Sequence, residues 1–295
     1  MAHKLNDREG GEPAATGSAR EANKRFAIDL ARAFGGAIIF SFPMLMTMEM
    51  WWLGFYMNSY RLALLMLLAI PMLVGLSFYG GFEDTFSGRD DILDTFVAYA
   101  VGFAACALML FLFAVIGPGM SADELIGKIS VQAVAGGIGA MTAQNLLGGG
   151  AGEGESEGER KKRSARYAGQ LFLMAVGAVF LSMSLASTEE MVLIAYKMTE
   201  WHVVALSLVT ILMMHAFVYA VEFRGEEAAI PPGSPFWSVF LRFTVAGYAL
   251  ALVISLYILW TFGRTEGMAV EEIIKAVVVL GFPAALGASS SRLIL

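Results

Sequence analysis

Cysteine and histidine are scarce in this chain. One cysteine, Cys106, and three histidines occur among its 295 residues. A single cysteine excludes an intrachain disulfide framework and any zinc or iron–sulfur centre built from several thiolates. Three histidines are too few to favour a multi-histidine metal centre. We therefore predict no metal site and no cofactor. Cys106 lies in an apolar run, and we interpret it as a small packing residue.

Charge is scarce as well. Only 16% of the residues are charged and 57% are hydrophobic, with a formal net charge of −6. Soluble domains contain about a quarter charged residues, so this composition is typical of a membrane protein. The negative net charge argues against nucleic acid as a partner, because nucleic acid binding needs a clustered basic surface.

Motifs of the common enzyme sites are also missing. The chain has no Gly-x-Ser-x-Gly elbow, no His-Glu-x-x-His helix and no dinucleotide-binding fingerprint. The glycines at 148–150 suggest a phosphate loop, but no Gly-Lys-Ser/Thr ending follows them. We therefore predict that the protein is not an enzyme.

Long apolar runs are what the chain has instead. A helix that crosses a bilayer needs roughly 20 apolar residues, and about eight runs of this kind occur. The predicted spans are residues 26–48, 61–79, 93–116, 121–147, 166–187, 201–221, 236–262 and 270–294. The sequence thus predicts an all-α polytopic membrane protein whose surroundings are the lipid bilayer.

Two polar segments lie outside these runs. Residues 1–25 are polar and have no apolar period, which predicts a disordered tail. Residues 148–165 combine alternating glycine and glutamate with the basic run 160–163, which predicts a flexible charged linker. The linker divides the remaining chain into two units, residues 26–147 and 166–295.

These two units resemble each other residue by residue. The match is ungapped over the first two spans at an offset of 141 residues, and it continues at an offset of 148. We therefore predict an internal duplication. Because each half has an even number of spans, the halves would be parallel four-helix repeats. Matched pairs include Gly36 and Gly177, Ser41 and Ser182, Met50 and Met191, Glu124 and Glu272, and Gly139 and Gly287.

Basic residues predict which side of the membrane each chain end faces. Most of them, including Lys24, Arg89, Arg163 and Arg224, fall on one side of the predicted spans. Cytoplasmic loops carry the excess of lysine and arginine. The N- and C-termini, the tail and the linker are therefore predicted to be cytoplasmic.

Acidic residues mark the opposite, outer boundary in both halves. Glu49 follows the first span, and Glu189 and Glu190 follow the fifth. A carboxylate at such a position costs free energy unless it reaches water, a cation or a partner. One interpretation is a pair of equivalent acids lining an entry for a cation or proton. The other is a helix-end acid that reaches outer water or pairs with Arg61 or His202.

A second polar group lies towards the cytoplasmic side. His215 lies inside the sixth span, Glu222 follows at a helical spacing of seven, and Arg242 enters the seventh span. Ionisable groups inside a membrane mark proton relays and ion paths. The alternative is a structural polar pair that joins two helices.

Small residues gather in residues 135–145 and in their counterpart, residues 283–292. One interpretation is close packing between helices. The other is a pore or substrate wall in which Thr142, Gln144 and Ser290 offer hydrogen bonds.

The run Leu-Met-Thr-Met-Glu-Met-Trp-Trp-Leu-Gly at residues 45–54 follows Gly35-Gly36 and Phe42-Pro43. It resembles a family of bacterial integral membrane proteins of unknown function, with a Thr-Met-Glu-Met-Trp-Trp signature at the end of the first span. The resemblance runs from about residue 26 to the C-terminus, without the linker. It implies a multi-pass protein of the bacterial inner (plasma) membrane, and it supplies no substrate and no catalytic residue.

The duplicated boundary acids and the missing enzyme motifs favour a channel or transporter for a small ion, with protons or metal cations first. The ion would pass between the two repeats, with Glu49 and Glu190 at the outer mouth. The alternative is a non-transporting membrane scaffold or stress-linked assembly partner that uses residues 153–163 as its contact element. The transported species and the assembly of a homo-oligomer stay open.

Overall fold

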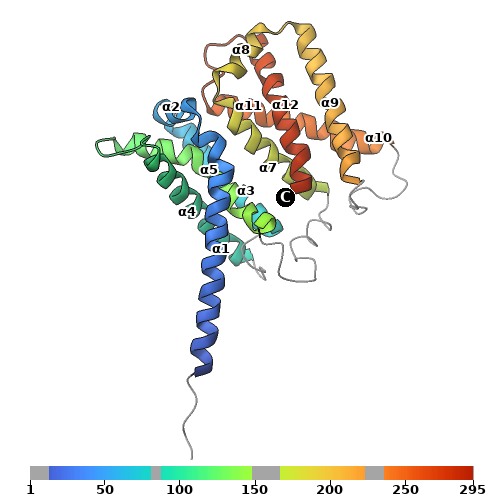
Figure 1. Cartoon of the computed structure of the whole chain (residues 1–295). Helices are drawn as coiled ribbons and strands as arrows, with labels where there is room; N and C mark the ends of the chain where they lie inside the picture. The colour runs from blue at the N-terminus through green and yellow to red at the C-terminus, as the bar shows by residue number, and fades with distance from the viewer. Residues whose placement is uncertain (1–12, 81–87, 148–166, 223–235, 295) are drawn as a thin grey trace, which may run out of the picture.

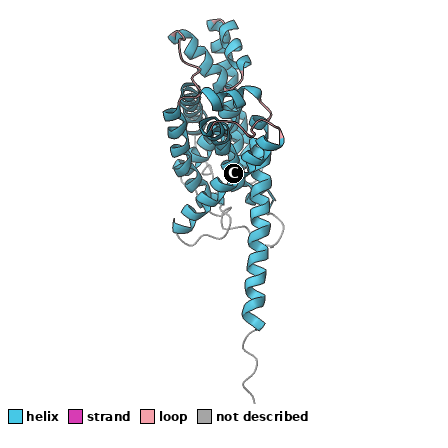
Figure 2. Cartoon of the chain, turned by 90° about the vertical axis from the view of Figure 1, so that its left-hand side faces the viewer, coloured by secondary structure: helices cyan, strands magenta, loops and turns pink. Residues whose placement is uncertain are grey.

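The structure is a computed structural model that describes residues 13–80, 88–147, 167–222 and 236–294. Every regular element in these ranges is a helix (Figures 1 and 2). Eight helices contain an apolar segment long enough to cross a membrane. The predicted class, an all-α polytopic protein with about eight spans, is therefore confirmed. The linker at 148–165 lies outside the described residues.

The first half contains five helices. They are α1 (Pro13–Leu45), α2 (Met48–Tyr56), α3 (Ser59–Gly80), α4 (Gly88–Leu112) and α5 (Ala122–Leu147). Residues 13–25 are helical, although the sequence placed them in a disordered tail. They include alanine, arginine and lysine, which are good helix formers, and they continue the first span without a break. Figure 1 shows this end of α1 reaching well beyond the other helices.

The second half follows the same order. Its elements are α7 (Tyr167–Ala186), α8 (Glu189–Lys197), α9 (Glu200–Glu222), α10 (Phe236–Val239), η1 (Phe240–Val245), α11 (Ala246–Thr261) and α12 (Val270–Ile294). The element η1 is a six-residue π-helix between α10 and α11. Such π-helical turns are rare and occur frequently at functional sites.

Short helices follow the first span of each half, between the predicted spans. Helices α2 and α8 are nine residues long and begin after Thr47 and Thr188, whose backbones are extended. Each threonine hydroxyl donates to a carbonyl at the end of the preceding helix, that of Pro43 or Leu185. The extended residue changes the direction of the chain, so the first span ends at Leu45 rather than at residue 48.

One helix lies at the centre of each half. Helix α5 packs against α1, α2, α3 and α4, and α12 packs against α7, α8, α9 and α11. Glycines allow the closest of these approaches. A Cβ atom added to Gly36 would overlap the backbone of Gly139, and one added to Gly177 would overlap the backbone of Gly287. Small residues in membrane helices permit this backbone contact.

A matched tyrosine contact also occurs in each half. The Tyr99 hydroxyl donates to the Met66 carbonyl at 3.2 Å, and the Tyr248 hydroxyl donates to Ser207 Oγ at 3.1 Å. Met66 and Ser207 are separated by the offset that matches the first two spans of the two halves. The duplication stays a prediction, and it would account for these paired contacts.

The two halves meet along α1, α3, α5, α7 and α11. Near the middle of the boundary, the rings of Phe40 and Phe180 lie 5.1 Å apart. Further along it, Gly75 of α3 lies directly against the ring of Phe172. The boundary is thus filled largely by apolar side chains.

Candidate functional site

The predicted boundary acids lie in the first turns of the short helices. Glu49 is the second residue of α2 and is half-buried, whereas Glu189 and Glu190 are the first two residues of α8 and are exposed. The ion pairs between described residues include none of these three carboxylates. A carboxylate in a first helical turn is stabilised by the helix dipole, which gives the acids a structural role without a cation.

Arg61 and His202, the predicted partners of these acids, contact other residues. Arg61 pairs with Glu266, and the ion pairs between described residues include none between Arg61 and Glu49. The Nδ1 atom of His202 lies 2.8 Å from the hydroxyl of Thr199, in the turn that opens α9.

The predicted inner group centres on the π-helix. His215 Nδ1 lies 3.0 Å from Thr244 Oγ1 of η1, and the imidazole packs edge-on against Phe240. Arg242 is exposed, and its backbone carbonyl accepts a hydrogen bond from the Tyr167 hydroxyl. The side chain of Glu222 lies outside the described part of the chain, so its pairing with Arg242 stays a prediction.

The residues predicted to line a pore wall form hydrogen bonds within their own helices. Thr142 is buried, and its hydroxyl donates to the Ile138 carbonyl at 3.0 Å. The Ser290 hydroxyl donates to the Gly287 carbonyl at 3.3 Å. Bonds of this kind satisfy a hydroxyl within its own helix, so both residues fit the packing interpretation. The side chain of Gln144 is not among those described.

Two buried lysines form a charged group that the sequence interpretation missed. Lys128 Nζ lies 2.6 Å from Glu124 Oε1, and Lys275 Nζ lies 2.6 Å from Glu271 Oε1. The lysine side chains are only 11% and 10% exposed, whereas Glu124 is 22% and Glu271 is 64% exposed. Glu272 lies further from Lys275, at 3.4 Å. We call these two groups the lysine–carboxylate pairs.

The local geometry follows from helical spacing. A glutamate four residues before a lysine lies on the same face of a helix, in the favourable order for a pair. Each pair lies in the first turns of the central helix of its half, because α5 begins at Ala122 and α12 at Val270. At 1.5 Å per residue, the lysines lie roughly 8 to 9 Å along these helices.

Short helices pack on both central helices. At Gly54, α2 lies so near α5 that an added Cβ would overlap the backbone of Lys128. Helix α8 packs on α12 through the buried residues Met191 and Ala195. Ala195 matches Gly54 at the offset of 141 residues. The short helices thus help to shield the start of each central helix.

Buried acceptors without a partner lie beside both pairs. Within the described residues, Gln132 Oε1 and Glu272 Oε2 are buried and have no hydrogen-bond partner. Gln132 is one turn deeper than Lys128, whose carbonyl accepts from Gln132 Nε2 at 3.1 Å. An unsatisfied buried acceptor calls for an explanation such as a water or an ion. The neighbourhood of each pair is therefore polar beyond the ion pair itself.

A charged contact joins the two halves on the side of the molecule where α2 and α8 lie. Arg61, in the first turn of α3, pairs with Glu266 of the α11–α12 loop at 2.7 Å. Its Nη1 atom also donates to the Trp260 carbonyl at 2.9 Å, and its guanidinium lies 4.7 Å from the Trp260 ring centre. Arg61 therefore joins the two halves through three kinds of contact.

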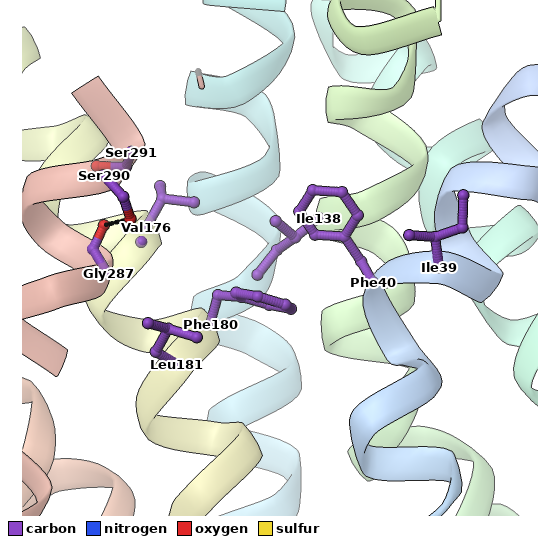
Figure 3. A pocket seen from close by; sticks show the side chains of 10 residues that line it. Ile39, Phe40, Ile138, Val176, Phe180, Leu181, Gly287, Ser290 and Ser291 are labelled. Carbon is purple, nitrogen blue, oxygen red and sulfur yellow. Dashed lines mark hydrogen bonds between the residues drawn. The ribbon is translucent and has the colours of Figure 1, made fainter. Parts of the chain in front are cut away.

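A cavity of about 300 Å³ lies on the boundary at greater depth. Figure 3 shows Phe40 and Phe180 projecting into the space between the helices. The only side-chain oxygens in the lining belong to two serines of α12. The lining residues are Ile39, Phe40, Ile138, Val176, Gly177, Phe180, Leu181, Gly287, Ser290 and Ser291.

Residues 29–295 match the model of a family described as "Putative integral membrane protein (DUF2391)". The chain belongs to the DUF2391 family. The match confirms the resemblance to an integral membrane family, although it does not test the signature at residues 47–52. The chain matches no curated protein and no solved structure.

Because the DUF2391 family is described as integral membrane proteins, the buried lysines are compared with ionisable residues in membrane segments. Lys128 and Lys275 lie near the beginning of two of the eight segments that are long and apolar enough to cross a membrane. Ionisable residues within membrane segments are rare and usually mark functional sites. Within the described ranges, no group of three His, Cys, Asp or Glu side chains is placed to hold a metal ion.

The sequence contained a signal for these pairs. A glutamate and a lysine four residues apart occur at the start of the fourth and eighth spans. The prediction of membrane sidedness counted Lys128 and Lys275 as surface charges. Such a count carries no information about burial.

Proposed function

We propose that this DUF2391 protein is a transporter for a small ion in the bacterial inner membrane, with the proton as the favoured ion. The observation that supports this function best is the presence, in each half, of a buried lysine that is paired with a carboxylate. The proposal includes no enzymatic activity.

The pairs are a poor device for stability alone. A well-packed apolar group does the same structural work without the desolvation of a buried lysine. Two such pairs, at the start of both central helices, therefore favour a role in handling charge.

The chemistry of the pairs favours the proton. Lysine can release its proton in a suitable environment, whereas arginine stays charged. A carboxylate 2.6 Å from the ammonium is within hydrogen-bond distance and can receive that proton. In the proposed cycle, the lysine passes its proton to the carboxylate, and a proton that arrives from the α2/α8 side then restores the charge of the lysine.

The route between the halves, as inferred from the sequence, requires motion. The boundary is apolar around the cavity, and an apolar constriction excludes water and ions. Arg61 joins the halves on the α2/α8 side. A transporter whose halves rock relative to each other fits these contacts better than an open channel.

Proton flux into liposomes tests the proposed function. The purified protein is reconstituted with a trapped pH-sensitive dye, and a potassium diffusion potential drives protons inward. We expect flux above that of empty liposomes, and a loss of at least ten-fold in the double variant Lys128→Arg with Lys275→Arg. Arginine keeps the ion pair but cannot release a proton.

The matched control is Lys197→Arg, because Lys197 is exposed at the end of α8. It should retain wild-type flux. Glu49→Gln with Glu190→Gln should lower the flux less than the lysine variants, since Glu190 is exposed. Equal flux in the double arginine variant and the wild type would contradict the proposal, provided that both elute as single species.

The scaffold alternative has no support from the described residues, because its contact element at 153–163 lies outside them. It would gain support if the wild type moved no ion and if deletion of residues 153–163 removed a co-purifying partner.

A further inference from the structure

We propose that the cavity between the two halves binds one acyl chain of a membrane phospholipid. The site requires only the bilayer and the cavity, and it does not depend on the proposed ion transport.

The depth of the cavity places it within the hydrocarbon of the membrane. Val176 lies nine residues into the span that begins at Tyr167, and Phe180 and Leu181 follow it. At 1.5 Å per residue, Val176 is roughly 13 Å along the helix. The hydrocarbon layer is about 30 Å thick, so the cavity lies near its middle.

The lining selects an apolar occupant. Most of the wall consists of aliphatic and aromatic carbon from α1, α5 and α7. The two serine hydroxyls are already bonded within α12, since Ser290 donates to the Gly287 carbonyl and Ser291 donates to the Ala288 carbonyl. An ion or a sugar would therefore lose its hydration without gaining a partner.

The cavity is large enough for part of a hydrocarbon chain. An apolar cavity of about 150 Å³ in another protein stays dry and binds benzene, and this cavity has about twice that volume, 300 Å³. Its walls cannot close by a shift of α7 towards α12, because Gly177 and Gly287 are already in backbone contact. Acyl chains are the apolar molecules that a bilayer supplies at this depth.

The cavity is also accessible from the membrane. Ile39 lines it and is 62% exposed. A chain can therefore enter from the surrounding lipid beside Ile39 and reach Phe180 and Val176. Such a chain would contact both halves and keep their boundary free of water.

Native mass spectrometry tests for the bound lipid. The full-length protein is extracted from membranes, washed with detergent and analysed for retained phospholipid. We expect one phospholipid on the wild type and a loss of at least five-fold in occupancy in Val176→Trp, whose ring would fill the cavity. The control Val253→Trp makes the same change on a lipid-facing position of α11 that is 66% exposed, and it should retain the lipid.

A labelling experiment tests the same site without filling it. In a Cys106→Ala background, Val176→Cys should resist a charged thiol reagent, whereas Thr199→Cys in the exposed α8–α9 turn should react completely. Equal labelling of both positions would show a hydrated cavity and overturn the acyl chain site. No retained phospholipid, a free fatty acid in its place, or equal retention by Val176→Trp and Val253→Trp would also overturn it.

Discussion

At the scale of single residues, adjacent glycines in α1 have opposite surroundings. An added Cβ at Gly36 would overlap the backbone of Gly139, whereas Gly35 has open space around the same position. We predict that Gly36→Ala destabilises the protein by about 1–3 kcal/mol, as overpacking of a filled interior does. Gly35→Ala should be neutral or stabilising by up to about 1 kcal/mol, because alanine is the better helix former.

Thermal unfolding in detergent can measure both variants. Cys106 is the single cysteine of the chain and is buried, so a fluorogenic thiol dye reports its exposure on unfolding. Equal melting temperatures for Gly36→Ala and Gly35→Ala would contradict the close contact between α1 and α5.

The glycines also show what a sequence can predict at this scale. Small-residue packing at 135–145 follows from composition, and the structure places Gly139 against Gly36. The lysine–carboxylate pairs were missed because burial of Lys128 depends on where α2 lies. That position follows from tertiary packing and not from the local pattern around Lys128.

At the scale of elements, one hydrogen bond ties α2 back to the end of α1. Trp51 Nε1 donates to the Leu45 carbonyl at 2.8 Å, whereas the neighbouring Trp52 is 58% exposed. We predict that Trp51→Phe lowers the free energy of unfolding by about 1 kcal/mol, the net contribution of a typical hydrogen bond. Trp52→Phe should change it by less than about 0.5 kcal/mol.

The same thiol-dye melting experiment compares these two tryptophan variants. A loss of stability that is as large for Trp52→Phe as for Trp51→Phe would argue against the tie between α1 and α2.

The apolar runs predicted the spans of both halves well, because length and hydrophobicity decide which segments cross a bilayer. They did not predict the break between α1 and α2 or the π-helix. The break depends on the extended backbone of Thr47 within an apolar stretch. The π-helix, in which Phe243 and Thr244 are both buried, has no local signal in the apolar pattern.

At the scale of the whole molecule, Arg61 forms a charged connection between the halves on the α2/α8 side. We predict that Arg61→Met speeds hydrogen exchange in residues 262–269, because it removes the contacts to Glu266 and Trp260. The loss of stability should be only about 1 kcal/mol, since an exposed ion pair and a cation–π contact each contribute little.

Lys197→Met provides the comparison for this exchange experiment, because it also removes an exposed basic residue on the same side. Similar exchange in the loop of both variants would mean that Arg61 does not hold the halves together.

The arrangement of the two halves could be predicted only in part. Residue matching predicted the duplication, and the paired contacts of Tyr99 and Tyr248 are what it would produce. The apolar boundary around Phe40 and Phe180 was not predicted, because contacts between the halves leave no periodic pattern in either half.

The proton flux of single lysine variants in liposomes tests the central claim most directly. Lys128→Arg and Lys275→Arg are measured separately beside the wild type and Lys197→Arg. If the pairs of both halves handle the transported proton, each single variant should lose at least half of the wild-type flux, and Lys197→Arg should lose none. Wild-type flux in both single variants, from protein that is folded and fully incorporated, would contradict the account.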